Sequence, residues 1–390
     1  MVKNKNAKRR GFFLGFGMSD ISLMIIAVIL IGSVYAQDAP SSGDRGGRSA
    51  RLDRPHDVGD GYVLADQGLA AESMSHCHED EGRQYLISWD QSIQDAVNHA
   101  RTGDVIVLRK KTYNENVIID SQHTKASCLT LKGENEDGTV VDGGNNRRVI
   151  TIKDDKKVTL KDMTIQNGNA GNDPYQPPCS GCNNTFGGGI LNDGKKLTIQ
   201  NCIIKHNMAD TGSGIFNDNG GTLKLISGTI CDNKALVGGG GIGNWGTLIM
   251  DGGIISGNHE GGIYSGNMFI LNDGAIAGNK ADKGGGVFNS GTMIMNDGTI
   301  SGNTADTVGG GIFNYAYLFT MKGGTISGNT AGLGGGILNM GTVNLWGGSI
   351  SLNNATATFS TPKGGGIFNI GDGKINDVHD NTPDQIAYSP

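Results

Sequence analysis

One copy of the chain's internal repeat reads Gly284-Gly285-Gly286-Val287-Phe288-Asn289-Ser290-Gly291-Thr292-Met293-Ile294-Met295-Asn296-Asp297-Gly298-Thr299-Ile300-Ser301-Gly302-Asn303. The aliphatic residue after its glycines recurs at Ile190, Ile215, Ile242, Ile263, Val287, Ile312, Ile337 and Ile367. The 177 residues from the first to the last of these positions make seven intervals, so one repeat has about 25 residues. Each repeat holds three short apolar runs separated by Gly, Asn and Asp, which we interpret as strands of three to five residues.

Strands this short cannot bury a face alone, so we expect each one to stack on its equivalent in the next repeat, giving three parallel sheets around one core. Left-handed hexapeptide helices repeat about every 18 residues and propeller blades about every 40 or more, and neither period fits. The predicted fold is therefore all-β, a right-handed parallel β-helix. Stacked Asn side chains should form hydrogen-bonded ladders at the position Asn207, Asn233, Asn258, Asn279, Asn303, Asn329 and Asn353.

Alternation along the strands indicates which side chains face the core. The middle run has apolar flanks in every coil, which we expect to point inward: Leu197/Ile199, Leu223/Leu225, Leu248/Met250, Phe269/Leu271, Met293/Met295, Phe319/Met321 and Val343/Leu345. The residue between the flanks varies and should point outward, which makes an exposed row of Ile249, Ile270 and Ile294.

A second outward row is predicted from the glycine-rich motif, where two adjacent residues are apolar. The uniformly aliphatic position should face the core, which leaves the next position outside: Leu191, Phe216, Tyr264, Phe288, Phe313, Leu338 and Phe368. Exposed apolar rows usually mark an interaction surface, and aromatic side chains stack on sugar rings or on another protein. The alternative is that a loop or the preceding linker covers the row.

The chain before the repeats divides into three parts. Residues 1–36 combine a basic start, the apolar run Ile21 to Val34 and a small-residue cleavage site, which predicts a signal peptide, with an uncleaved N-terminal anchor as the alternative. Residues 37–84 read as a disordered linker, and residues 85–384 as the β-helix domain. Ser88 to Gln91 fits a capping box, and Ile93, Ala96, Val97 and Ala100 share one helical face, so a short helix ending at Gly103 should cap the stack.

The entry segment and the repeats also carry a family resemblance. The stretches 92–97, 102–107 and 113–117 resemble the entry into pectin-lyase-like β-helix domains. The Gly-Gly-Gly-Ile-Phe-Asn and Ile-Ser-Gly-Asn-Thr-Ala repeats resemble surface proteins of the polymorphic outer membrane protein type, and together the likeness covers residues 85 to 380. It implies the fold, but this fold hosts lyases, hydrolases, adhesins and fibres.

Candidate chemistry is sparse in the repeats. The polygalacturonase-like motifs Asn-Thr-Asp and Gly-His-Gly are absent, and Asp154-Asp155 resembles a turn. Four titratable residues align between coils and form the weak catalytic candidates His206, Asp232, Lys234 and His259. Asp251, Asp273 and Asp297 each precede a glycine in successive repeats, and such a column would need solvent or calcium to offset its repulsion. Solvated corners and ordinary Asp-Gly turns are the alternatives, and no other cofactor is expected.

Composition limits the remaining choices. The chain has 66 glycines among 390 residues but no Gly-X-Y period, which excludes collagen. Its net charge is −6, and its basic run, Lys3 to Arg10, lies at the extreme N-terminus, which argues against nucleic-acid binding. In an exported chain the six cysteines favour structural disulfides, with candidates Cys179, Cys182, Cys202 and Cys231.

Three classes of function follow, all outside the cell or in its envelope. The first is a surface or secreted binding protein, adhesin-like or part of the envelope, which uses exposed apolar rows to bind carbohydrate or a surface protein. The second is a polysaccharide lyase or glycoside hydrolase, which requires a charged groove. The third is a spacer or self-assembling layer protein. A membrane contact is expected only through an uncleaved N-terminal segment.

Overall fold

A computed structural model of the chain describes residues 82–175, 185–315, 317–356, 364–370, 373–376 and 386–388. The predicted signal peptide, nearly all of the predicted linker, Cys179 and Cys182 lie outside these residues. In the part of the chain that the structure describes, no helix is long and apolar enough to span a bilayer.

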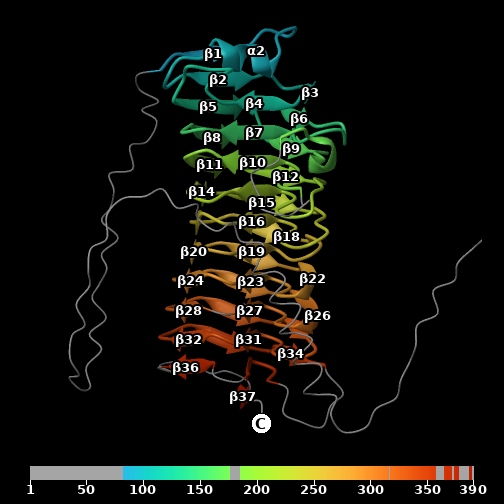
Figure 1. Ribbon diagram of the computed structural model, residues 1–390, viewed down its shortest axis with the longest axis vertical. Coiled ribbons are helices and arrows are strands. Elements are labelled where there is room, and N and C mark those ends of the chain that lie inside the picture. The colour runs from blue at the N-terminus through green and yellow to red at the C-terminus, as the bar shows by residue number, and fades with distance from the viewer. Residues whose placement is uncertain are drawn as a thin grey trace, which may run out of the picture. The chain divides into compact units, whose positions relative to one another are not determined.

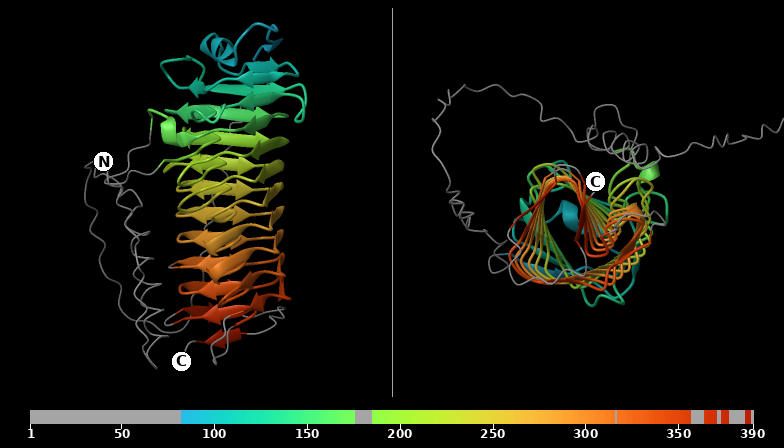
Figure 2. Two further views of the ribbon diagram at one scale, coloured as in Figure 1. Left: turned by 90° about the vertical axis from the view of Figure 1, so that its right-hand side faces the viewer. Right: turned by 90° about the horizontal axis from the view of Figure 1, so that it is seen from below.

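The described residues form a right-handed parallel β-helix with three sheets per coil, as the repeat predicts (Figures 1 and 2). Each coil contributes one strand to each of three sheets, which we call A, B and C, and the chain passes through them in the order C, A, B. Every strand pairs in parallel with the equivalent strand of the next coil. A fourth sheet, D, which the repeat pattern did not predict, lies between sheets B and C in the later coils.

The strands are short throughout. Sheet A contains β1 (Gln84–Leu86), β2 (Val105–Leu108), β5 (Cys128–Gly133), β8 (Lys157–Lys161), β11 (Lys196–Gln200), β14 (Thr222–Leu225), β17 (Thr247–Met250), β20 (Met268–Leu271), β24 (Thr292–Met295), β28 (Leu318–Met321), β32 (Thr342–Leu345) and β36 (Lys374–Asn376). Sheet B contains β3 (Thr112–Asn114), β6 (Val140–Asp142), β9 (Thr164–Gln166), β12 (Cys202–Lys205), β15 (Gly228–Cys231), β18 (Ile254–Ser256), β21 (Ala275–Ala277), β25 (Thr299–Ser301), β29 (Thr325–Ser327) and β33 (Ser349–Ser351).

Sheet C contains β4 (Val117–Ile119), β7 (Ile150–Lys153), β10 (Ile190–Asp193), β13 (Ile215–Asn217), β16 (Ile242–Asn244), β19 (Ile263–Ser265), β23 (Val287–Asn289), β27 (Ile312–Asn314), β31 (Ile337–Asn339), β35 (Ile367–Asn369) and β37 (Ile386–Tyr388). Sheet D contains β22 (Lys280–Lys283), β26 (Thr304–Val308), β30 (Thr330–Ala331) and β34 (Asn354–Ala355). A single turn of 3₁₀ helix, η1, spans Ala170–Asn172.

The core follows the predicted alternation. The aliphatic position of sheet C and both flanks of each sheet A strand are buried, from Ile190 to Ile367 and from Leu197 to Leu345. Ile249, Ile270 and Ile294 point outward from sheet A and are half-buried, so their predicted direction is confirmed.

Two asparagine ladders run along the stack. The predicted ladder, Asn207 to Asn353, is buried, and each amide nitrogen donates to the amide oxygen of the next coil over 2.9–3.0 Å. A second ladder follows the end of the sheet C strands, where Ser265 takes the place of one Asn. Because each ladder satisfies buried polar groups in a fixed register, both hold the coils in alignment.

The predicted helix is α2 (Ile93–Asn98), which lies at the β1 and β2 end of the stack (Figure 1). Its predicted apolar face is buried. The cap was assigned to the wrong serine, because the Ser92 hydroxyl accepts from the Asp95 backbone nitrogen while Ser88 donates to Asp90. The helix also ends before Gly103, at Asn98. Its role as a cap of the stack stays a prediction.

The aromatic row of sheet C points away from the main core, as predicted, but it is not exposed, so the prediction of an exposed row was wrong. Phe216, Tyr264, Phe288, Phe313 and Phe368 are between 1% and 8% exposed. The segment between sheets B and C covers them, since its Val308 packs in one cluster with Tyr264, Phe288, Phe313 and Phe368, and its Phe186 packs in another with Phe216. The row is therefore a second apolar core, covered by the chain's own loops, which was the alternative interpretation.

Candidate functional site

Charged residues gather where the first strands of sheet C end. Asp120, Lys153, Asp193, Asp218 and Trp245 occupy one position in successive coils, and we call them the rim column. Lys153 and Asp193 lie opposite each other in the register of neighbouring strands. The backbone nitrogens of Asp218 and Trp245 donate to carbonyl oxygens of the preceding coil, over 2.9 and 2.8 Å. Neighbouring parallel strands lie about 4.8 Å apart, so these side chains leave the fold side by side.

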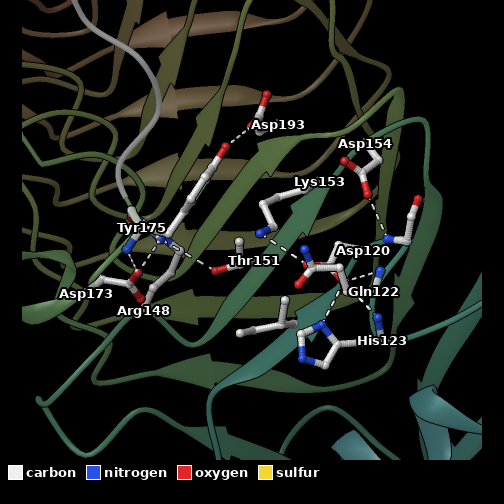
Figure 3. A network of polar contacts seen from close by, with 12 residues as sticks. Asp120, Gln122, His123, Arg148, Thr151, Lys153, Asp154, Asp173, Tyr175 and Asp193 are labelled. Carbon is white, nitrogen blue, oxygen red and sulfur yellow. Dashed lines mark hydrogen bonds and ion pairs between the residues drawn. The ribbon is translucent and has the colours of Figure 1, made fainter.

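The first two members of the rim column form an ion pair. The Lys153 ammonium lies 3.1 Å from one Asp120 oxygen, and His123 Nδ1 lies 2.7 Å from the other (Figure 3). Burial alone would raise the pKa of Asp120, but the hydrogen bonds from His123 and Lys153 outweigh it and lower this pKa to about 2. Asp120 is therefore an anion over the whole physiological range and keeps Lys153 in place.

Tyr175, which follows the 3₁₀ turn η1, also contacts the rim column. Its hydroxyl donates to Asp193, and its ring lies under the Lys153 ammonium, 4.5 Å from the ring centre (Figure 3). Burial and the carboxylate of Asp193 raise the pKa of Tyr175, so its hydroxyl keeps its proton. Burial also raises the pKa of Asp193, against the lowering effect of the Tyr175 hydrogen bond.

Arg148 binds the segments that flank Tyr175. Its guanidinium is fully buried and lies 3.2 Å from Asp173. It also donates to the carbonyl oxygens of Tyr175, Phe186 and Gly187, at 3.2, 2.7 and 2.7 Å. Arg148 thus fixes the chain on both sides of residues 176–184 and positions Tyr175 over the rim column.

Asp218 is the next carboxyl of the rim column. It is half-buried, and burial together with the charge of neighbouring Asp193 raises its pKa to about 6, against a hydrogen bond from Asn219. A carboxyl that titrates near neutrality can hold or release a proton under working conditions. Trp245 stands next in the column and is half-exposed, with its ring between those of Phe216, at 4.9 Å, and Tyr264, at 5.0 Å. The rim column thus places a half-exposed aromatic side chain after two carboxyls.

Replacing Asp218 by Asn should stabilise the protein at alkaline pH. The folded-state pKa of about 6 lies above the ordinary value near 4, so the folded wild-type chain loses stability as the pH rises from about 4 through 6. An amide does not ionise, and we expect Asp218→Asn to unfold with about 2 kcal/mol more free energy at pH 8, after allowing for partial solvent exposure, and with no gain at pH 4. Urea unfolding at both pH values measures this, and equal effects at the two would contradict it.

The predicted catalytic candidates lie at exposed corners. His206 and Asp232 occupy the same left-handed turn position, with φ of 55° and 53°, and Lys234 pairs with His259 in the next coil. His206, Lys234 and His259 are exposed. The predicted alignment is therefore confirmed, while a catalytic role stays a prediction. Over the described ranges, no group of three or more His, Cys, Asp or Glu side chains could hold a metal ion.

The predicted aspartate column is out of register by one residue. Asp251 aligns with Asn272 and Asn296, because the strands pair Met250 with Leu271 and Leu271 with Met295. Asp251 accepts from Asn272 at 2.7 Å and forms a 2.7 Å ion pair with Lys224. Asp273 and Asp297 each accept from the backbone nitrogen of the following glycine, as ordinary Asp-Gly turns do.

The cysteine prediction was wrong for two of its four candidates. Cys202 and Cys231 are free thiols, and burial raises their pKa values to about 12 and about 11. Cys128, which was not a candidate, is disulfide-bonded. Cys179 and Cys182 lie outside these residues as well.

The sequence reasoning missed the rim column, although a signal was available. Asn192-Asp193 and Asn217-Asp218 repeat at the same place after the glycine-rich motif, whereas Trp245 takes the place of the Asp in the next coil.

Comparisons with protein-family models, with curated proteins and with solved structures found no match for this chain.

Proposed function

We propose that this chain is an exported cell-surface or secreted β-helix protein that binds carbohydrate at the rim column. The observation that carries this proposal is the half-exposed Trp245 ring next to the half-buried carboxyls of Asp193 and Asp218. The ring of Trp245 is held between those of Phe216 and Tyr264, so its exposed edge would pack against a sugar ring, while carboxyl oxygens accept hydrogen bonds from the sugar hydroxyls. The repeated coils would let neighbouring sugars of a polymer follow the column.

Export is supported by two independent features. The basic and apolar N-terminal stretch has the composition of a signal peptide. Cys128 is disulfide-bonded, and such bonds persist in oxidising compartments outside the cytosol. The resemblance of residues 92–117 to pectin-lyase-like domains, and of the repeats to polymorphic outer membrane proteins, favours the same setting.

Cleavage of a bound polysaccharide is the second candidate, and Asp218 is the observation that favours it. A general acid in glycoside hydrolysis must be protonated near neutral pH, and burial of Asp218 with its neighbour Asp193 raises its pKa to about 6. Asp218 would protonate the leaving oxygen. A carboxylate nearby would then assist the attack of water.

A glycan array with the purified chain tests both candidates. We expect Trp245→Ala to weaken binding of its best glycan at least 10-fold, because the aromatic contact is lost, while Trp89→Ala, at an exposed tryptophan near α2, changes nothing. Binding that survives Trp245→Ala and Asp218→Asn alike would sink the proposal. Release of new reducing ends that stops in Asp218→Asn, with binding retained, would show an enzyme.

A further inference from the structure

An apolar patch lies on the outer face of sheet A in the middle coils. Ile249, Ile270 and Ile294 stand in register in successive strands and point away from the core. Met268 and Leu318 point the same way from the first position of their strands. All five side chains are half-buried, and strands β17, β20 and β24 contain no charged residue. We call these five residues the isoleucine face, and a contiguous apolar patch of this kind usually marks a contact surface.

The chain enters sheet A at the head of one column of residues. Gly82, just before β1, lies against Gly103, because a Cβ on Gly82 would overlap the Gly103 carbonyl oxygen. The Gly103 nitrogen donates to the carbonyl oxygen of Cys128 over 2.8 Å. The pairing register continues this column from Cys128 through Lys196 to Met268, along the side of the stack that Figure 1 labels β5 to β20. Cys128 is therefore two coil spacings, or about 10 Å, from the point of entry.

Cys128 is disulfide-bonded and faces outward from β5, and its position favours Cys77 as its partner. The free thiols of sheet B are excluded, which leaves three candidates: Cys77, Cys179 and Cys182. Arg148 holds the chain on both sides of residues 176–184 next to β7 of sheet C, whereas Cys128 begins a strand of sheet A. Cys77 lies five residues before Gly82. Five extended residues span about 17 Å, which is more than the separation to be bridged.

The residues before β1 have a composition that suits this surface. Residues 66–81 contain no Lys or Arg but five acidic residues: Asp66, Glu72, Glu79, Asp80 and Glu81. Strands β8 and β11, between Cys128 and the isoleucine face, contain three lysines and no acidic residue. Charge therefore favours a path of this segment along sheet A.

An apolar run precedes the acidic stretch, from Tyr62 to Ala65. Leu64 is 13 residues before Cys77, and an extended chain of this length spans about 43 Å. Strands β5 and β20 are five coil spacings apart in sheet A, or about 24 Å. The apolar run can therefore reach the isoleucine face from a tether at Cys128.

We propose that the segment before β1 is a strap along the outer face of sheet A, tied by a disulfide between Cys77 and Cys128, with Tyr62 to Ala65 on the isoleucine face. Two thiols lose two protons and two electrons as this bond forms, and a disulfide of the oxidising compartment accepts them by exchange. A tethered segment gives up little further freedom when it covers the patch. The strap lies on sheet A and the rim column on sheet C, so the two proposals stand separately.

Mass spectrometry of the purified chain, denatured and digested with trypsin without reduction, tests the disulfide. We expect residues 52–83, which contain Cys77, to be linked to residues 126–132, which contain Cys128. Trypsin leaves Cys179 and Cys182 together in a third peptide, residues 162–195. A link between this third peptide and residues 126–132 would overturn the proposal, and so would a free Cys77 thiol.

Limited digestion of the folded chain with chymotrypsin tests where the strap lies, because cleavage after Tyr62 or Leu64 requires this run to leave the surface. We expect Ile270→Thr combined with Ile294→Thr to speed this cleavage at least 5-fold. The fold should accept both changes, since Thr320 holds this position in the next coil. Cys77→Ser combined with Cys128→Ser should also speed cleavage at least 5-fold, because the tether is lost.

The matched control is Ile203→Thr combined with Ile254→Thr, two outward isoleucines of sheet B that lie beside Thr229. Its cleavage rate should equal that of the wild type, and circular dichroism should show every variant folded. Equal rates in the two isoleucine pairs would overturn docking on the isoleucine face, even with the Cys77–Cys128 bond present. An unchanged rate in the double serine variant would show that the disulfide does not hold the strap.

Discussion

Replacing Phe313 by Ala should lower the free energy of unfolding by about 3–5 kcal/mol, the usual range for removing a buried aromatic ring. Phe313 is 1% exposed, and its ring lies 4.9 Å from that of Phe288 and 5.7 Å from that of Tyr315. Val308 and Leu338 belong to the same cluster. Urea unfolding followed by circular dichroism measures the loss.

Two further variants separate core packing from surface contact. Ile294→Ala removes a half-buried residue of the outer face of sheet A and should cost about 1 kcal/mol or less. Phe313→Leu should cost less than about 1.5 kcal/mol, since Leu338 fills the equivalent position in the next coil. If Phe313→Ala proves no more damaging than Ile294→Ala, the second core does not exist and the aromatic row faces solvent.

The fold was predictable because every coil repeats the same physical solution. Alternation placed Leu197 and Ile199 inside, and the same assignment held for each later coil because the pairing register does not slip. The ladder of Asn303 was predictable for the same reason. A side chain that recurs at one turn of a stacked coil meets its own copy about 4.8 Å away.

The aromatic row shows where periodicity stops being informative. Alternation tells only that Phe216 and Phe313 point away from the main core, and it does not reveal what lies on that side. Their burial depends on the path of the segment between sheets B and C, which turns back at a left-handed glycine, such as Gly309 with φ of 66°. A Cβ at Gly309 would lie 2.6 Å from the carbonyl oxygen of Ile312, so only glycine permits this close return.

The rim column was missed because it breaks the repeat. A search for columns that are identical in every coil finds Asn and Ile, whereas the rim column changes from Asp120 to Lys153, returns to Asp at 193 and 218, and ends at Trp245. Their raised and lowered pKa values arise from burial and from each other, which depends on the register. The aspartate column failed for the opposite reason, since a shared Asp-Gly pair concealed a shift of one residue at Asp251.

Replacing Asn303 by Ala should destabilise the chain by about 4 kcal/mol, because it disrupts several buried hydrogen bonds at once. The Asn303 amide oxygen accepts from the backbone and side-chain nitrogens of Asn279, both at 3.0 Å. Its amide nitrogen donates to Ile276 O at 2.9 Å and to Asn329 at 3.0 Å. Ala leaves these buried partners without water, and the cost falls on the interface between three successive coils.

Asn296→Ala is the matched control for Asn303→Ala. Asn296 is exposed and its amide donates to Asn272 at 2.7 Å, so the same truncation at the surface should change stability by less than about 0.5 kcal/mol. Unfolding should be followed by circular dichroism and by tryptophan fluorescence together, because a stack of coils can come apart in steps. Separate transitions in Asn303→Ala would mean that the coils on either side of the broken ladder unfold independently. Equal effects of the two variants would mean that the ladder does not hold the coils together.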